Sequence, residues 1–143
     1  MDIRKPGGWY RPIPAAEGIA AEFWTSAAGG RLLIQRCPAC GARQFYPRPV
    51  CMTCGADPEW EEASGRGVVH TFTVIRQNGA RPFRDELPYV VAMIELVEGP
   101  RMMGNVTGCA PDEVTVGMPV VAYAVMVEEG IAVPFWEPAA HLG

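Results

Sequence analysis

Hydrophobic and polar residues alternate in short runs along the second half of the chain, and this pattern predicts β-strands. In the first run we expect Val68, His70, Phe72 and Val74 to share one face, because successive side chains of a strand point to opposite sides. Turns rich in Gly and Pro separate the runs. Five short strands with this punctuation favour a small Greek-key barrel. The predicted strands are 68–75, 89–97, 101–107, 120–127 and 131–136.

The first thirty residues follow a different pattern. Residues 1–13 are rich in Pro and Gly, which predicts an extended arm, and we expect the aromatic groups of Trp9 and Tyr10 to dock on another surface. The next stretch predicts a helix over 14–28, since Pro14 suits a first helical turn and a glycine pair follows Ala28.

One side of this predicted helix is strongly apolar. Ile19 and Phe23 lie four residues apart, and so do Ala20 and Trp24. This side either packs against the chain's own domain or docks on a partner subunit, and both interpretations stay open. Five residues of the arm and helix are therefore candidates for partner docking: Trp9, Tyr10, Ile19, Phe23 and Trp24.

Two Cys-x-x-Cys pairs, each followed by Gly and separated from each other by ten residues, predict a metal site. The four cysteines are Cys37, Cys40, Cys51 and Cys54. Four thiolates at this spacing satisfy the tetrahedral preference of Zn²⁺ and leave no open position, so the metal is structural. Two disulfides would require an oxidising compartment, which the odd fifth cysteine, Cys109, and the absence of a secretory leader disfavour.

These patterns divide the chain into an arm and helix (1–30), a zinc ribbon (31–62) and a barrel (63–143). We expect the ribbon and the barrel to have separate hydrophobic cores, with zinc replacing the core that a short ribbon lacks. No apolar run is long enough to span a membrane. Without a secretory signal in the opening residues, the chain is expected in the cytoplasm.

Charge narrows the choice of ligand. The net charge is −4 and Lys5 is the only lysine, which disfavours polyanion binding by the whole surface. Between Trp24 and Asp57 there is no acidic residue, although this stretch holds four arginines. These arginines either offset the charge of the zinc thiolates or form a patch for CoA phosphates or an acidic partner. They are Arg31, Arg36, Arg43 and Arg48.

Two further groups are candidate contacts for CoA or a partner. Phe45 and Tyr46 either stack on an adenine or pack within the ribbon. Arg81 and Arg84 flank Phe83 in the polar loop 78–87.

Side chains suited to catalysis are scarce. The chain has two serines, Ser26 and Ser64, and two histidines, His70 and His141. It has no nucleophile elbow, phosphate loop, dinucleotide fingerprint or zinc-protease helix. We therefore assign no catalytic residue.

Several motifs together resemble one known family. They are the paired Cys-x-x-Cys motifs in RLLIQRCPACGARQFYPRPVCMTCG, the Ser-Gly-Arg-Gly at 64–67, the Pro-Tyr-Val-Val at 88–91 and the Gly-Met-Pro at 117–119. From Glu17 nearly to Pro138, the chain resembles the paired zinc-ribbon and OB-fold proteins that were long classed as a domain of unknown function. Members of that family are found beside thiolase-like enzymes and in acyl-CoA metabolism.

The resemblance implies a mainly β fold with an N-terminal helix, a rubredoxin-like zinc ribbon and a five-stranded OB-fold barrel. It also implies a non-catalytic accessory subunit whose partner, a thiolase-like or lipid-transfer-type enzyme, acts on acyl-CoA thioesters. The partner's reaction would be condensation or retro-aldol cleavage, including that of steroid side chains. The accessory subunit would stabilise the partner and help to bind or channel the CoA thioester.

Two alternatives remain. OB-fold barrels and zinc ribbons also bind single-stranded nucleic acid through aromatic platforms and basic grooves. The other alternative is an obligatory aldolase subunit that contributes residues to a shared active site. Arg66, His70, Tyr89 and Asn105 would then be the residues of interest.

Overall fold

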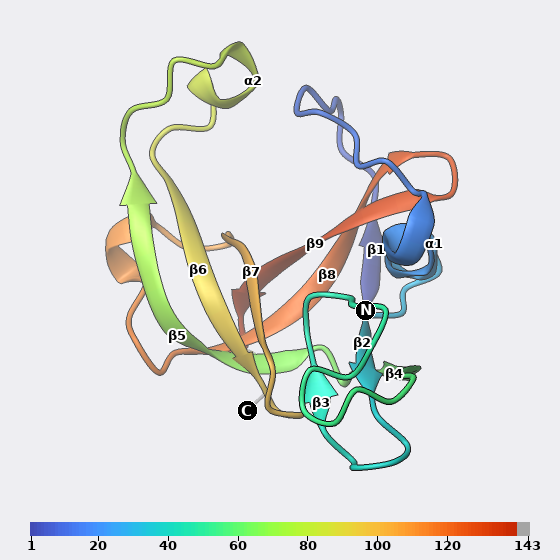
Figure 1. The fold of residues 1–143 in the computed structure, drawn as a ribbon. Coiled ribbons are helices and arrows are strands. Elements are labelled where there is room, and N and C mark those ends of the chain that lie inside the picture. Colours follow the sequence, from blue (N-terminus) through green and yellow to red (C-terminus); the bar gives the residue numbers. More distant parts are fainter. Residues whose placement is uncertain (140–143) are drawn as a thin grey trace.

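Five strands form a small barrel in the computed structural model, which describes residues 1–139 (Figure 1). Hydrogen bonds connect them in the order β8-β5-β6-β7-β9, and pairing of β8 with β9 closes the barrel. The mainly β fold and the five-stranded barrel are thereby confirmed. The strands are β5 (Arg66–Ile75), β6 (Tyr89–Leu96), β7 (Arg101–Val106), β8 (Pro119–Glu128) and β9 (Ile131–Pro138).

The zinc ribbon is a separate three-stranded sheet beside the barrel, and α1 lies next to it (Figure 1). The remaining strand, β1, pairs in parallel with β8 beyond the segment of β8 that pairs with β5. Among the described helices, none is both long and apolar enough to cross a membrane. These further elements are β1 (Asp2–Arg4), η1 (Gly18–Ala20), α1 (Ala21–Ala28), β2 (Leu33–Arg36), β3 (Arg43–Gln44), β4 (Glu59–Glu62), α2 (Arg81–Arg84) and η2 (Pro111–Glu113).

The N-terminal helix begins later than the sequence indicates. Glu17 is extended and Gly18 has a φ of 64°, in the left-handed region, so residues 14–17 do not join a right-handed helix. The helical segment therefore begins at Gly18 rather than at Pro14. Its end is as predicted, because Gly29 is the C-cap residue of α1.

The register predicted for β5 is wrong in its first half. A β-bulge between Val69 and Thr71 adds a residue to this strand, so inward and outward positions exchange along it. Val69 is fully buried, whereas Val68 and His70 are exposed. The alternation of β6 is as predicted, since Val90 and every second residue after it are buried.

The ribbon and the barrel share one hydrophobic core, which contradicts the prediction of separate cores. Leu32, Leu33 and Ile34 of the ribbon are buried in the same cluster as Val69 and Ile94 of the barrel. Within β2, Leu33, Ile34 and Gln35 are three consecutive buried residues, so both faces of this strand are covered.

Helix α1 connects the two modules. Phe23 belongs to the shared core, where its ring contacts Trp24 and Phe45 at centroid distances of 4.9 and 5.2 Å. On the next turn, Ala27 packs against Ala124 and Ala132 of the barrel, and all three are fully buried. Phe23 therefore lies in the interior of this chain.

The barrel wall is incomplete between β7 and β9. These parallel strands share a single pair, Val106 with Trp136, and their preceding residues diverge into a seam. The Trp136 ring lies directly against Gly104, where an added Cβ would be 2.6 Å from Cδ1 of the indole. The glycine therefore lets the Trp136 ring fill the barrel interior at the closed end of this seam.

The shared core predicts that ribbon and barrel unfold together. Phe23→Ala removes a buried ring at their junction and is expected to cost about 3–5 kcal/mol of unfolding free energy. Native-state hydrogen exchange should show the same loss of protection in β2 of the ribbon and β6 of the barrel. Ile19→Ala, at an exposed position before the same helix, is the matched control and should change stability by less than about 0.5 kcal/mol. Loss of protection confined to β2 would contradict a common core.

Candidate functional site

The four predicted metal ligands lie on two similar turns. In each turn a glycine N–H donates to the carbonyl of the first cysteine: Gly41 to Cys37, and Gly55 to Cys51, each at 2.8 Å. Both glycines have a φ near 80° (78° and 81°), a conformation that residues with a Cβ rarely adopt. The glycine that follows each Cys pair is thus part of the turn that brings its two sulfurs together.

The sulfur geometry fits a tetrahedral ion. All four Sγ atoms lie within 4.8 Å of one another, with 3.5 Å between Cys37 and Cys54 and 3.7 Å between Cys40 and Cys51. A tetrahedron with Zn–S bonds of about 2.3 Å has sulfurs about 3.8 Å apart. The four cysteines therefore suit structural zinc.

Backbone donors favour the thiolate form of two of the four cysteines, Cys37 and Cys51. The N–H of Cys40 lowers the pKa of Cys37. The N–H groups of Cys54 and Thr53 lower the pKa of the Cys51 thiol to about 6. Because the metal binds thiolates, these hydrogen bonds prepare the site for the ion.

The arginines around the ribbon are largely matched by the acidic residues that follow it. Arg43 makes a bidentate pair with Glu61, at 2.7 and 2.9 Å, which lowers the pKa of the Glu61 carboxyl. Arg31 pairs with Glu62 at 3.3 Å. Arg36 is exposed at the end of β2, and the backbone of Arg48 exchanges two hydrogen bonds with Gln35. Two of the four predicted cations are thus already paired within this chain.

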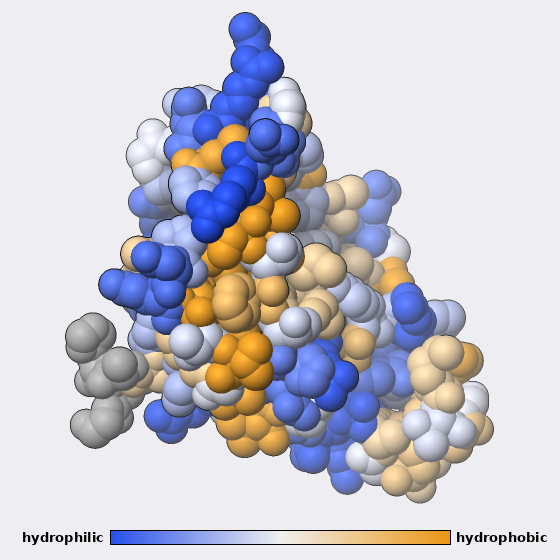
Figure 2. All heavy atoms as spheres, turned by 90° about the vertical axis from the view of Figure 1, so that its left-hand side faces the viewer, coloured by the Kyte–Doolittle hydropathy of each residue, from blue (hydrophilic) through white to orange (hydrophobic). Residues whose placement is uncertain are grey.

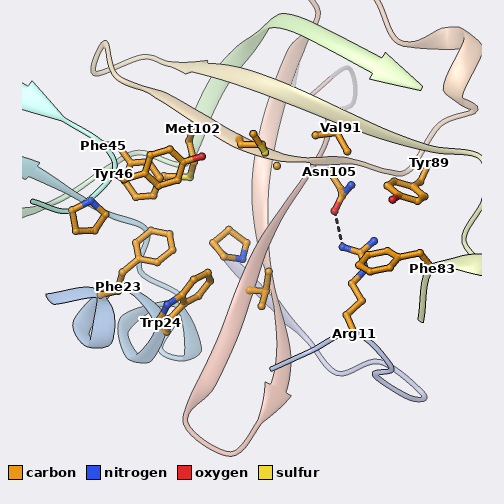
Figure 3. Close-up of a pocket in the computed structure, with 16 residues that line it drawn as sticks. Arg11, Phe23, Trp24, Phe45, Tyr46, Phe83, Tyr89, Val91, Met102 and Asn105 are labelled. Atoms are coloured by element: carbon orange, nitrogen blue, oxygen red, sulfur yellow. Dashed lines mark hydrogen bonds between the residues drawn. The ribbon is translucent and has the colours of Figure 1, made fainter. Parts of the chain in front are cut away.

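A hollow with a mainly apolar lining lies at the seam between β7 and β9, between the ribbon with α1 and the loop that carries α2 (Figure 3). We call it the seam groove. It has a volume of about 420 Å³. Val91, Met103 and Asn105 come from the outer face of β6 and β7, and Val133 and Pro134 come from β9. The outer face of the second and third barrel strands is the surface with which OB-folds commonly bind ligands.

One end of the seam groove is aromatic (Figure 3). Phe45 and Tyr46 of the ribbon lie opposite Phe23 and Trp24 of α1. The rings contact one another in sequence, with centroid distances of 4.6 Å between Phe45 and Tyr46 and 5.2 Å between Phe23 and Phe45. Phe23 and Trp24 were predicted to dock on a partner, and Phe45 and Tyr46 were predicted to contact CoA or a partner. The ring contacts bring both pairs together in a single wall of the groove.

The other end of the seam groove is polar and is organised by Arg11. This guanidinium donates to Asn105 Oδ1 at 2.7 Å and to both carboxylate oxygens of Glu86, at 2.9 and 3.1 Å. Asn105 in turn donates to the Val90 carbonyl. Four aromatic rings surround the cation at 5.0–5.8 Å: Trp9, Phe83, Tyr89 and Phe135.

Arg11 and Glu86 were missed by sequence reasoning. They lie 75 residues apart, one in the arm and one in the loop after β5. The local signal was the position of Arg11 beside two aromatic residues, a pattern typical of cation–π contacts. It does not identify Glu86 as the partner, because that pairing depends on the tertiary fold.

The remaining predicted contacts are dispersed. Trp9 docks edge-on against Phe135, with centroids 6.0 Å apart, while Tyr10 is 82% exposed. Ile19 is also exposed. Arg81 and Arg84 lie on α2 beside the arm, where Arg84 donates to the Gly79 carbonyl.

Groups capable of catalysis are not concentrated at the seam groove. Its described lining contains no Ser, Thr, Cys, His, Asp, Glu or Lys. Ser64 accepts a hydrogen bond from the N–H of Arg66, as expected of a turn residue. Burial raises the pKa of Cys109, and the charge of Glu113 adds to this effect, so its thiol is not activated. His141 lies outside the described residues.

The geometry bears on both alternative functions. Of the four residues considered for a shared active site, Tyr89 and Asn105 meet in the seam groove, whereas Arg66 and His70 lie exposed on β5. Among the described residues that line the groove, Arg11 is the one cation, and its charge is paired with Glu86. A nucleic-acid groove needs several cations that can reach phosphates, so this arrangement does not favour that alternative.

Two family models match adjoining parts of the chain. The rubredoxin-like zinc ribbon domain of ChsH2 matches residues 24–61, and the C-terminal OB-fold domain of ChsH2 matches residues 60–125. A DUF35 domain-containing scaffold protein from Methanocaldococcus jannaschii is 38% identical over 96 residues, which cover 66% of this chain and 67% of the relative.

Longer relatives are named as hydratase subunits. A probable enoyl-CoA hydratase alpha subunit from Thermomonospora curvata is 39% identical over 130 residues, covering 90% of this chain and 40% of the relative. The 3-oxo-4,17-pregnadiene-20-carboxyl-CoA hydratase alpha subunit of Mycobacterium tuberculosis is 35% identical over 122 residues, covering 85% and 38%. The chain thus spans about two fifths of the length of these two relatives.

A solved structure titled Ltp2-ChsH2(DUF35) aldolase is similar to the whole arrangement. It has a TM-score of 0.79 and 38% identity, and it covers 88% of this chain and 98% of that chain. The resemblance stated from the motifs is therefore confirmed. The chain belongs to the ChsH2 (DUF35) family, whose members join a rubredoxin-like zinc ribbon to an OB-fold.

Proposed function

We propose that this chain is a non-catalytic scaffolding subunit that binds a thiolase-type enzyme acting on acyl-CoA thioesters. The observation that carries the proposal is the seam groove, a formed hollow whose described lining has no Ser, Thr, Cys or Lys and no carboxylate or imidazole base. Such a hollow can bind a ligand, but its lining places no base beside Tyr46 and Tyr89 that would activate their hydroxyls for catalysis. The bond-making residues then belong to a partner, which carries out condensation or retro-aldol cleavage.

The names of the similar proteins support this division of labour. One is a scaffold protein, two are alpha subunits of hydratases that act on CoA thioesters, and the solved structure is named for two components of an aldolase. A subunit role is common to these names. For this chain, the thiolase type of the partner and the CoA thioester are part of the proposal.

Exposed apolar side chains indicate where the partner binds. Seven of the eleven large hydrophobic residues exposed in the described part of the chain lie in the arm, helix and ribbon. Exposed apolar residues gathered on one region are typical of protein interfaces. We place the partner contact there, on Ile3, Tyr10, Ile13, Ile19, Tyr46, Val50 and Met52.

Structural zinc supports this surface indirectly. The metal fixes the two Cys turns, and the segment between them carries Tyr46 and Val50. We expect the chain in the cytoplasm, where thiols stay reduced and available for zinc. CoA phosphates would have to bind outside the paired arginines Arg31 and Arg43. The candidates that remain for a CoA contact are Arg36, Arg48, Arg81 and Arg84.

A charge placed on the exposed side of the helical segment should break the complex. Ile19→Asp is expected to weaken binding of the co-expressed thiolase-type enzyme by tenfold or more, because it would bury an unpaired carboxylate in the interface. Val97→Asp, at a more exposed position on the barrel, is the matched control and should leave binding unchanged. Affinity-tag co-purification and calorimetry measure the effect. Separate elution of the wild-type chain and the enzyme would count against the proposal itself.

Removal of zinc should abolish partner binding through the ribbon. Cys40→Ser is expected to lose most of its zinc and the ordered ribbon, since structural zinc contributes about 10 kcal/mol or more to such segments. Because the core is shared, barrel stability should fall as well. Cys109→Ser, which changes the cysteine outside the metal cluster, should retain one zinc per chain and full binding. Metal analysis with co-purification tests this, and an intact complex without zinc would contradict it.

A further inference from the structure

The second half of β5 has an edge without a partner strand. Pairing between β5 and β8 stops at Val69, whose N–H donates to the Met118 carbonyl at 3.0 Å and whose carbonyl accepts from the Gly117 N–H at 2.7 Å. Beyond this point β5 pairs with β6 on one side only, within the part of the chain that the structure describes. Figure 1 shows this half of β5 at the outside of the barrel, away from α1 and the ribbon. Because backbone groups of a strand point alternately to either side, residues 70–75 present a row of donors and acceptors with no strand to pair with.

This edge lacks the features that keep edge strands from pairing with another chain. Those features include Pro, charged side chains and a very short strand. Residues 70–75 contain no Pro, Gly, Lys, Arg, Asp or Glu, and five of the six are β-branched or aromatic. Such residues favour an extended backbone, so the stretch is a template on which another strand can form.

Apolar side chains border the open edge. Val68 is 36% exposed and Val116, next to Gly117, is 68% exposed, while Ile75 is half-buried at the opposite end. Figure 2 shows a band of hydrophobic residues on this face. A strand added here therefore buries apolar surface in addition to forming backbone hydrogen bonds.

A second copy of the same edge satisfies the geometry. In antiparallel pairing about a two-fold axis between Phe72 and Thr73, Phe72 lies opposite Thr73 of the other copy, and all six residues have a partner. Paired residues of antiparallel strands point to the same side of the sheet. Phe72 packs against the core of its own barrel, whereas Thr73 is exposed. The two barrels therefore lie on opposite faces of the joined sheet and do not collide.

Charge favours a second copy at this edge. Residues 70–75 carry no carboxylate, ammonium or guanidinium group, so two copies of the edge do not repel each other. Arg76 follows the edge and, in this register, lies opposite Val69 of the other copy. The loop that hydrogen-bonds to Val69 also carries the exposed residues Asp112 and Glu113. Opposite charges are thereby brought towards each other at both ends of the paired stretch.

We propose that two copies of this chain pair through residues 70–75 of β5 and join their barrels in one continuous sheet. The inference goes beyond the proposed function, because it concerns a second copy of the chain rather than the enzyme. The helix and the ribbon lie on the side of the barrel away from β5 (Figure 1), so pairing leaves both enzyme-contact regions accessible. A pair of chains then holds two enzyme molecules.

Sedimentation velocity of the zinc-loaded chain over a range of concentrations tests the pairing. We expect a reversible dimer and no larger species, because a two-fold contact is closed. Thr73→Lys places two ammonium groups beside the two-fold axis and should weaken the dimer by tenfold or more. Thr25→Lys adds the same charge at an exposed position of α1 and should dimerise as the wild type does.

Two results of this measurement would overturn the inference. One is a wild-type chain that stays monomeric up to its solubility limit. The other is equal dimerisation of the wild type and Thr73→Lys.

Hydrogen exchange locates the contact without a substitution. The amides of residues 70–75 that point away from β6 should exchange slowly where the wild type is a dimer and quickly after dilution to the monomer. Exchange of these amides that does not change with dilution, in a chain that does dimerise, would place the contact elsewhere and contradict the pairing through β5.

Co-purification separates this inference from the proposed function. Thr73→Lys should retain the co-expressed thiolase-type enzyme while losing the dimer. If the isolated chain is monomeric and the enzyme protects the same amides from exchange, the edge binds the enzyme, so the second-copy inference is wrong while the scaffolding role stands. Failure of the wild-type chain to bind any thiolase-type enzyme would reject the proposed function, whatever the chain's own state of association.

Discussion

Burial of the ribbon strand β2 against the barrel is the contact on which the rest of the structure depends. Leu32, Leu33 and Ile34 are covered on both sides, and the ring of Phe23 closes the same cluster. Burial of each such side chain contributes about 1.5–3 kcal/mol, so this junction is a large part of a small protein's stability. The zinc site fixes the two Cys turns of the ribbon, and the shared core joins β2 to the barrel.

The seam groove lies where the ribbon and α1 meet the barrel. Because β7 and β9 share a single pair, the barrel wall opens beside the ribbon, and the rings of Phe45 and Tyr46 come to face Phe23 and Trp24 across it. The surface in Figure 2 shows hydrophobic residues continuing in a band down the face that carries β5 and β6 in Figure 1. Apolar surface on this protein is therefore extensive both in a hollow and on an open face.

Local chemistry was sufficient to predict the metal ligands and most of the strands. The Cys-x-x-Cys-Gly spacing encodes the turn that aims each sulfur, and the regular alternation of β6 encodes its buried face. The register of β5 was not predictable in this way, since a bulge exchanges the two faces without changing composition. The run Leu32–Ile34 did contain the relevant signal, because three successive apolar residues are typical of a strand buried on both sides.

Long-range pairing explains what the sequence did not reveal. Arg11 donates hydrogen bonds to Glu86 and Asn105 only when the arm lies across the barrel, and no local sequence pattern specifies this position of the arm. The pairing of Arg31 and Arg43 with Glu62 and Glu61 likewise depends on the ribbon sheet. The domain boundaries at residues 30 and 62 stay a prediction. The shared hydrophobic core contains residues on both sides of each boundary, so burial does not mark where one domain ends.

The central claim is that this chain binds and the partner reacts. The most direct measurement is turnover of an acyl-CoA thioester by the zinc-loaded chain alone, by the partner enzyme alone and by the purified complex. We expect no turnover by the chain alone, and full activity only in the complex. Sustained turnover by the isolated chain, proportional to its concentration and free of co-purifying enzyme, would contradict it.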